Sequence, residues 1–123
     1  MPQDGPFRPL ATEDDLQDAL RHSDDEPVVF YKHSSTCPIS AQAEDEMKSL
    51  LSNSGAPPVY ELVVQESRDM SDRIAEHFSI RHETPQAIVV SDGEPVFNAS
   101  HHDVTAASVR QAASQILAVF PAF

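Results

Sequence analysis

Residues 28–40 read VVFYKHSSTCPIS, and this stretch decides the fold. The apolar, β-rich run at 28–31 is bounded by turn-forming residues and predicts a buried strand. A polar loop follows the strand. Thr36 is a suitable N-cap and proline is favoured in the first helical turn, so Pro38 marks the start of a predicted helix. Cys37 is the only cysteine of the chain, and it therefore lies between the carboxyl end of a strand and the start of a helix.

The rest of the chain divides into further helices and strands by its apolar periodicity. Thr12 and Asp15 form a capping-box pattern at the start of a first helix. The pair Asp92 and Gly93 tolerates positive φ and predicts a hairpin turn. The predicted elements are, in order, a helix from about residue 12, a strand at 28–31, a helix at 36–51, a strand at 59–64, a helix at 68–78, strands at 87–90 and 95–100, and a helix from residue 105.

This order of elements predicts an α/β fold. Two parallel strand–helix–strand steps, a hairpin and a covering helix give a central mixed four-stranded sheet flanked by helices. The arrangement resembles the thioredoxin-like fold with an extra N-terminal helix. We expect residues 1–10 to form an irregular N-terminal arm and residues 11–123 to form a single thioredoxin-like domain.

Composition limits the partners and the compartment. The net charge is −12, with 20 acidic and 8 basic residues, which disfavours a nucleic-acid partner because phosphate binding needs lysine and arginine. This acidity fits either a high-salt cytoplasm or ordinary solubility. No apolar run approaches the roughly 20 residues that span a bilayer, and no signal-peptide core follows the N-terminus. We therefore expect no membrane partner and a cytoplasmic location.

The position of Cys37 predicts a reactive thiol. A single cysteine excludes an internal disulfide. At a helix start, backbone N–H groups and the helix dipole stabilise a thiolate, so the thiol pKa is expected below its usual value of roughly 8.5. Such a thiolate attacks disulfide sulfur. A buried and inert cysteine is the alternative, but the polar residues 34–36 favour an exposed helix start.

Ser40 stands where a dithiol redoxin carries its second cysteine, so the chain reads as a monothiol redoxin. A mixed disulfide formed on Cys37 must then be resolved by a thiol from solution. Ser40 retains a hydroxyl that can hydrogen-bond to the thiolate from one turn on. The predicted catalytic residue is Cys37, and the residues predicted to support its thiolate are Thr36, Pro38, Ser40, Lys32 and His33.

Three segments resemble a known family. TCPIS at 36–40 and HETPQA at 82–87, together with VQESR at 64–68, are similar to the monothiol redoxins of the bacillithiol system, the YtxJ-like or bacilliredoxin C-like family. The resemblance runs from about Val28 to Phe120. It implies a cytoplasmic thioredoxin-like enzyme that removes bacillithiol from S-bacillithiolated client proteins.

The resemblance also implies the substrate side of the site. The catalytic cysteine would take the bacillithiol, and a second bacillithiol or a partner reductase would free it. Bacillithiol is thus the expected co-substrate, and no metal is expected. The fold places a cis-proline at Thr84–Pro85, which leaves the Thr84 backbone free to pair with an incoming peptide or thiol. Arg68 is a predicted substrate-binding residue, with Lys32 and Arg81 as further candidates for binding an anion.

Other readings of the sequence compete with this one. A monothiol redoxin can hold an iron–sulfur cluster between two subunits, although that family carries Gly-Phe where this chain has Pro38 and Ile39. A thioredoxin-like adaptor without chemistry is a third class. Residues 101–103, His-His-Asp, are adjacent and cannot easily converge on one ion, so they are expected to form a solvated loop. His82 either tunes the thiol or is a loop residue without a role.

Overall fold

The computed structural model describes residues 7–36, 38–52 and 56–119, with the backbone alone described for 116–119. The described part forms a five-stranded mixed sheet with four α-helices. The strands are β1 (Arg8–Pro9), β2 (Val28–His33), β3 (Val59–Val63), β4 (Gln86–Ser91) and β5 (Glu94–Ser100). The helices are α1 (Glu13–His22), α2 (Pro38–Leu51), α3 (Arg68–Phe78) and α4 (Ala106–Val119), with a 3-10 turn η1 (His101–Asp103) before the last.

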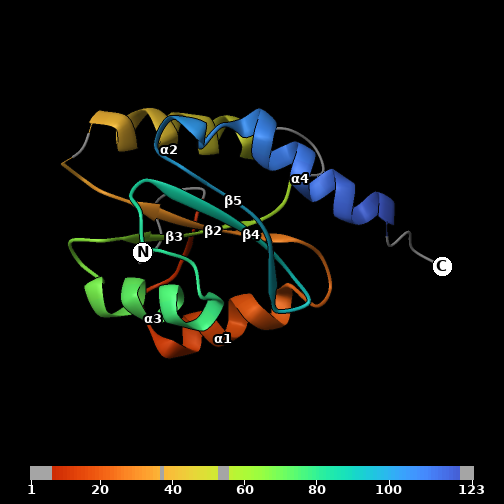
Figure 1. The fold of residues 1–123 in the computed structure, drawn as a ribbon, viewed down its shortest axis with the longest axis horizontal. Coiled ribbons are helices and arrows are strands. Elements are labelled where there is room, and N and C mark those ends of the chain that lie inside the picture. Colours follow the sequence, from red (N-terminus) through yellow and green to blue (C-terminus); the bar gives the residue numbers. More distant parts are fainter. Residues whose placement is uncertain (1–6, 37, 53–55, 120–123) are drawn as a thin grey trace.

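The sheet has the order β1-β3-β2-β4-β5. Its first three members run parallel, whereas β4 pairs antiparallel with β2 and forms a hairpin with β5. Figure 1 shows α2 and α4 on one face of the sheet and α1 and α3 on the other. The predicted α/β fold is confirmed, and the predicted hairpin turn has positive φ at both Asp92 and Gly93.

The central strand β2 has a core on each of its faces because successive side chains of a strand alternate. Val29 and Tyr31 belong to the apolar cluster beneath α2 and α4. Val28 and Phe30 belong to the cluster beneath α1 and α3. All four side chains are fully buried. A strand covered on both faces reads as a continuous apolar run, which explains why the sequence signal at 28–31 is strong.

Residues 7–10 take part in the sheet and in the core. The prediction of an irregular arm through residue 10 is wrong at its end, because β1 pairs with β3 in the register Arg8 with Tyr60. The sheet therefore has one strand more than the predicted four. Phe7 and Leu10 are buried in the clusters on opposite faces of the sheet. A two-residue strand is too short to show a period-2 pattern, and its proline is tolerated only because the strand lies at the edge.

Helix α1 begins with a capping box formed by Thr12 and Asp15. Asp15 donates its backbone N–H to Thr12 Oγ1 at 3.1 Å, and the Thr12 backbone N–H donates back to the Asp15 carboxylate at 3.1 Å. We expect Thr12→Ala to lower the free energy of unfolding in urea by about 1 kcal/mol. Ser67 is the matched control, since it precedes α3 without a side-chain cap bond. Equal losses in Thr12→Ala and Ser67→Ala would contradict the role of the cap.

Candidate active site

Helix α2 begins at Pro38, directly after Cys37 in the chain. Cys37 itself lies outside the described residues, so the site is described from its neighbours. Thr36 and Pro38 are exposed, which places both sides of the cysteine position at the protein surface. The first turn of α2 carries no acidic residue. The N-terminal charge of the helix dipole is therefore not neutralised locally.

A glutamine from another element holds the loop before the cysteine. The side-chain oxygen of Gln65 accepts the backbone N–H of Ser35 at 3.1 Å. Its amide nitrogen donates to Ser34 Oγ at 2.8 Å and to Thr36 Oγ1 at 3.2 Å. Gln65 lies just after β3, some 30 residues along the chain. The sequence analysis gave it no role, and its place in the segment 64–68 was the only signal that pointed to it.

Ser40 joins the first turn of α2 to the same loop. It is fully buried. Its Oγ accepts the backbone N–H of Ser34 at 3.2 Å, and its carbonyl oxygen accepts the Tyr31 hydroxyl at 3.2 Å. Burial raises the pKa of Tyr31 well above its ordinary value, so the phenol keeps its proton. These bonds give Ser40 a structural function that is separate from the predicted contact with the thiolate.

Lys32 lies on the face of the sheet away from α2. The prediction of a loop at residues 32 and 33 is wrong, because the pairing of β2 with β3 continues through both of them. Lys32 is 1% exposed, and its Nζ donates to the carbonyl of Ser71 in α3 at 3.1 Å. Nζ also lies 3.2 Å from His82 Nδ1. Burial lowers the pKa of Lys32 to about 8, against a smaller opposite effect of Asp72.

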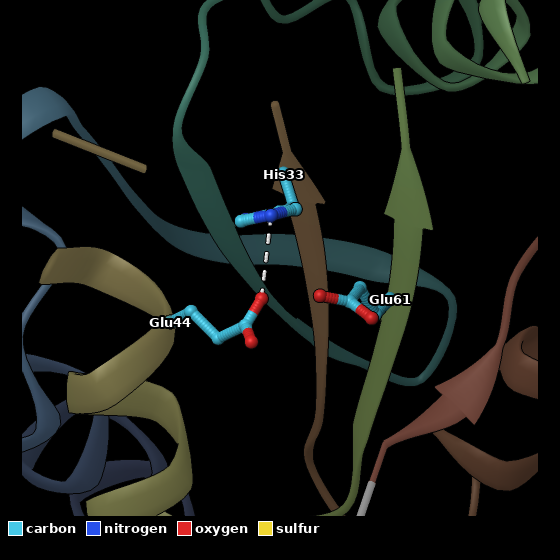
Figure 2. Close-up of side chains that lie close together, drawn as sticks. All are labelled: His33, Glu44 and Glu61. Carbon is cyan, nitrogen blue, oxygen red and sulfur yellow. Dashed lines mark ion pairs between the residues drawn. The ribbon is translucent and has the colours of Figure 1, made fainter. Parts of the chain in front are cut away.

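His33 projects from the opposite face, toward α2. Its Nδ1 lies 3.0 Å from the Tyr31 hydroxyl and its Nε2 lies 3.3 Å from Glu44 Oε1. Figure 2 shows Glu61 of β3 turned toward the same point. Burial, followed by the charge of Glu44, raises the pKa of Glu61 to about 7. The sequence analysis missed both carboxylates, because β2, α2 and β3 each supply one member of this group and no spacing motif joins them.

The loop before β4 carries the predicted substrate-binding pair. The Thr84–Pro85 peptide bond is cis, as the resemblance implied. Pro85 is buried, and its carbonyl oxygen accepts the backbone N–H of His101 at 2.9 Å. Thr84 is half-buried. The loop at this junction is therefore hydrogen-bonded to η1. Residues 101–103 are exposed, as expected, but form this 3-10 turn and not an irregular loop.

The predicted anion-binding residues differ in burial, because Lys32 is buried and the two arginines are exposed. Arg68 is exposed at the first position of α3. Arg81 is 90% exposed and lies 3.8 Å from a carboxylate oxygen of Glu83. Burial and the charge of Lys32 lower the pKa of His82. Lys32 is therefore a buried cation in contact with the exposed His82, whereas both arginines are exposed.

Comparisons with known proteins agree with this geometry. The family model of the monothiol bacilliredoxin BrxC matches residues 8–109. A solved structure described as a proposed oxidoreductase with a thioredoxin fold is similar at 37% identity and a TM-score of 0.79, over 88% of this chain and 94% of that one. Two thioredoxins share the fold. That of Fasciola hepatica has 16% identity and a TM-score of 0.72, over 89% of this chain and 98% of its own. That of Trypanosoma brucei brucei has 12% identity and a TM-score of 0.73, over 96% and 97%.

Within residues 7–36, 38–52 and 56–119, no helix combines the length and the apolar character that crossing a bilayer requires.

Burial of Lys32 predicts a pH dependence of stability. Lys32 loses its proton near pH 8 in the folded protein and near 10.5 when unfolded, so the unfolded chain binds more protons between these values. Native stability therefore rises with pH in this window, by at most about 3 kcal/mol. Lys32→Met removes this gain. We expect the unfolding free energy of the parent protein to rise relative to Lys32→Met as pH increases through the window.

The control for this measurement is Lys48→Met. Lys48 is half-exposed and pairs with Glu44 at 3.1 Å, so its loss reports the effect of removing a lysine from the surface. Titration of the groups that neither lysine perturbs is common to all three proteins and cancels in the differences. A difference between the parent and Lys32→Met that stays flat from about pH 7 to about pH 10 would contradict the proposed burial cost.

Proposed function

Because the chain belongs to the monothiol bacilliredoxin family BrxC, we propose that Cys37 removes a low-molecular-weight thiol from protein mixed disulfides. The observation that carries the proposal is the family match over residues 8–109, which includes a lone cysteine followed by Ser40 in place of a second one. The thioredoxin-like fold supports thiol redox chemistry in general. The specific reaction is our inference from the family.

The first step transfers the small thiol to Cys37. The Cys37 thiolate attacks the sulfur of the small thiol within the mixed disulfide, and the bond to the client sulfur breaks. The client leaves as a thiolate and takes a proton from solvent. One disulfide is lost and one is formed, so the step has no net oxidation. The start of α2 favours this attack because its unpaired N–H groups stabilise the thiolate.

The second step restores the free cysteine. A second molecule of the small thiol, as its thiolate, attacks the small-thiol sulfur of the adduct and releases the Cys37 thiolate. The products are the reduced protein and the symmetrical disulfide of the small thiol. A partner reductase with its own electron donor would then reduce that disulfide. Ser40 cannot replace the external thiol, because a hydroxyl cannot expel a bound sulfur.

We propose bacillithiol as the small thiol and S-bacillithiolated proteins as the clients, on the strength of the family. We also propose a cytoplasmic location, since a thiol that must be reduced in every cycle suits a reducing compartment. The cis peptide bond at Thr84–Pro85 and the exposed Arg68 are the proposed contacts for the incoming disulfide.

The proposed reaction predicts a specific adduct. Reduced protein and its Cys37→Ala variant are incubated separately with bacillithiol disulfide and with glutathione disulfide, and intact mass is followed over time. We expect a bacillithiol adduct on the parent protein only, removed by free bacillithiol. A glutathione adduct alone would retain the mechanism and overturn the proposed co-substrate. If neither adduct forms under conditions that modify a model thiol, the proposed enzyme activity is wrong and a non-catalytic adaptor function is favoured.

Gln65 is predicted to act as a positioning residue for Cys37. Gln65→Met removes all three hydrogen bonds to the loop and is expected to slow adduct formation roughly tenfold. Gln65→Glu keeps the bond from the Ser35 N–H but loses both donors and adds a negative charge. We therefore expect its alkylation rate with iodoacetamide to reach half its maximum at a higher pH. Gln17→Met on α1, where the glutamine bonds only to Glu13 of the same helix among its described contacts, is the control and should react as the parent does.

A further inference from the structure

Three Lewis-basic side chains converge between the sheet and α2. They are His33 of β2, Glu44 of α2 and Glu61 of β3, and one ligand atom of each lies within 4.8 Å of the others. Figure 2 shows the three side chains directed at a common point from separate elements. All three are half-buried. The group is not a surface patch of acids, because it includes an imidazole and lies beneath a helix.

The hydrogen bonds of Tyr31 determine which nitrogen of His33 faces this point. The single hydroxyl hydrogen of Tyr31 is donated to the carbonyl of Ser40. The hydroxyl oxygen must then accept from His33 Nδ1, which lies 3.0 Å away. A neutral His33 accordingly carries its hydrogen on Nδ1, and the lone pair of Nε2 points at Glu44 Oε1, 3.3 Å away. Two lone pairs that face each other need a proton or a cation between them.

Within the described residues, the carboxylate of Glu61 also lacks a hydrogen-bond partner for one of its oxygens. This oxygen, Oε2, is buried, and a carboxylate in that state is poorly compensated for its burial. Lys48 binds Glu44 through Oε2 at 3.1 Å. The other oxygen of Glu44, Oε1, is the one that faces His33. Lys48 thus pairs with the Glu44 oxygen that does not face His33, and Oε1 remains available as a ligand atom.

We propose that His33, Glu44 and Glu61 bind a divalent transition-metal ion, with Zn²⁺ as the best match. One imidazole and two carboxylates form a mixed nitrogen and oxygen set that suits this ion, with a fourth position for water. Tetrahedral zinc with bonds of about 2.0–2.2 Å holds its ligand atoms about 3.3–3.6 Å apart. His33 Nε2 and Glu44 Oε1, at 3.3 Å, lie at the short end of this range. The ligand atom of Glu61 lies within 4.8 Å of the other two, so a change in its side-chain torsions would complete the set.

Tyr31 is the outer partner that orients the histidine. Metal-bound histidines donate their second ring N–H to a neighbouring acceptor, which fixes the tautomer and the ring. Tyr31 makes this bond here while its own hydrogen is fixed by Ser40. The proposal goes beyond the thiol chemistry and needs no contribution from Cys37. A bound ion would link β2, β3 and α2 at one point.

Zinc binding is measured by titration of tag-free, chelator-treated Cys37→Ser protein with Zn²⁺ against a chromophoric chelator. The Cys37→Ser substitution ensures that the cysteine thiol does not contribute to the measured zinc affinity. We expect one ion per chain and a rise in the melting temperature with zinc concentration. We expect Glu61→Gln and His33→Gln each to weaken binding at least about tenfold, and Tyr31→Phe to weaken it about tenfold without removing a ligand.

The matched control is the double variant His101→Gln with Glu83→Gln. It removes another histidine–glutamate pair, with a separation of 3.4 Å, and should leave the zinc affinity unchanged. Circular dichroism verifies that each variant is folded. Absence of a single-ion isotherm in the Cys37→Ser protein would overturn the proposal, and a proton would then be the occupant of the group. Equal losses in the control and in Glu61→Gln would overturn it as well.

Discussion

The register between β2 and β3 is the constraint on which the site depends. Their parallel pairing continues to His33 opposite Val63, so the last two residues of β2 keep the strand's alternation. Lys32 therefore enters the layer beneath α3, whereas His33 enters the layer beneath α2. The same register brings the residues after β3 alongside the loop before Cys37, where Gln65 can reach them. A slip of one residue would exchange the two environments.

Burial outweighs the overall charge of the chain in setting its internal electrostatics. The protein carries a net charge of −12, yet burial lowers the pKa of its lysine at position 32 and raises that of Glu61. Both shifts favour the neutral form of a group removed from water. The acidic surface is largely screened by solvent, so the local surroundings of each group decide its protonation.

The sequence predicted the elements that depend on local or periodic signals. The central strand follows from an apolar run, the start of the helix after Cys37 from a proline, and the hairpin at Asp92 and Gly93 from a turn pair. The strand β1 has only two residues and no detectable period, and the end of β2 carries polar side chains that resemble a loop. The roles of Gln65 and of the Glu61 carboxylate depend on contacts with residues that are distant in the sequence. Such contacts leave no spacing pattern in a single chain, so only the structure identifies them.

The short strand β1 has a consequence for the behaviour of the protein in concentrated solution. It covers the outer edge of β3, whose sequence VYELV is rich in β-forming residues. An uncovered edge strand of this kind is a template for pairing with another molecule. Phe7 and Leu10 flank β1 and hold it in place, because their side chains are buried on opposite faces of the sheet. Strand β1 thus protects the edge of β3 from pairing with other molecules. Removal of the first ten residues would expose this edge and favour self-association.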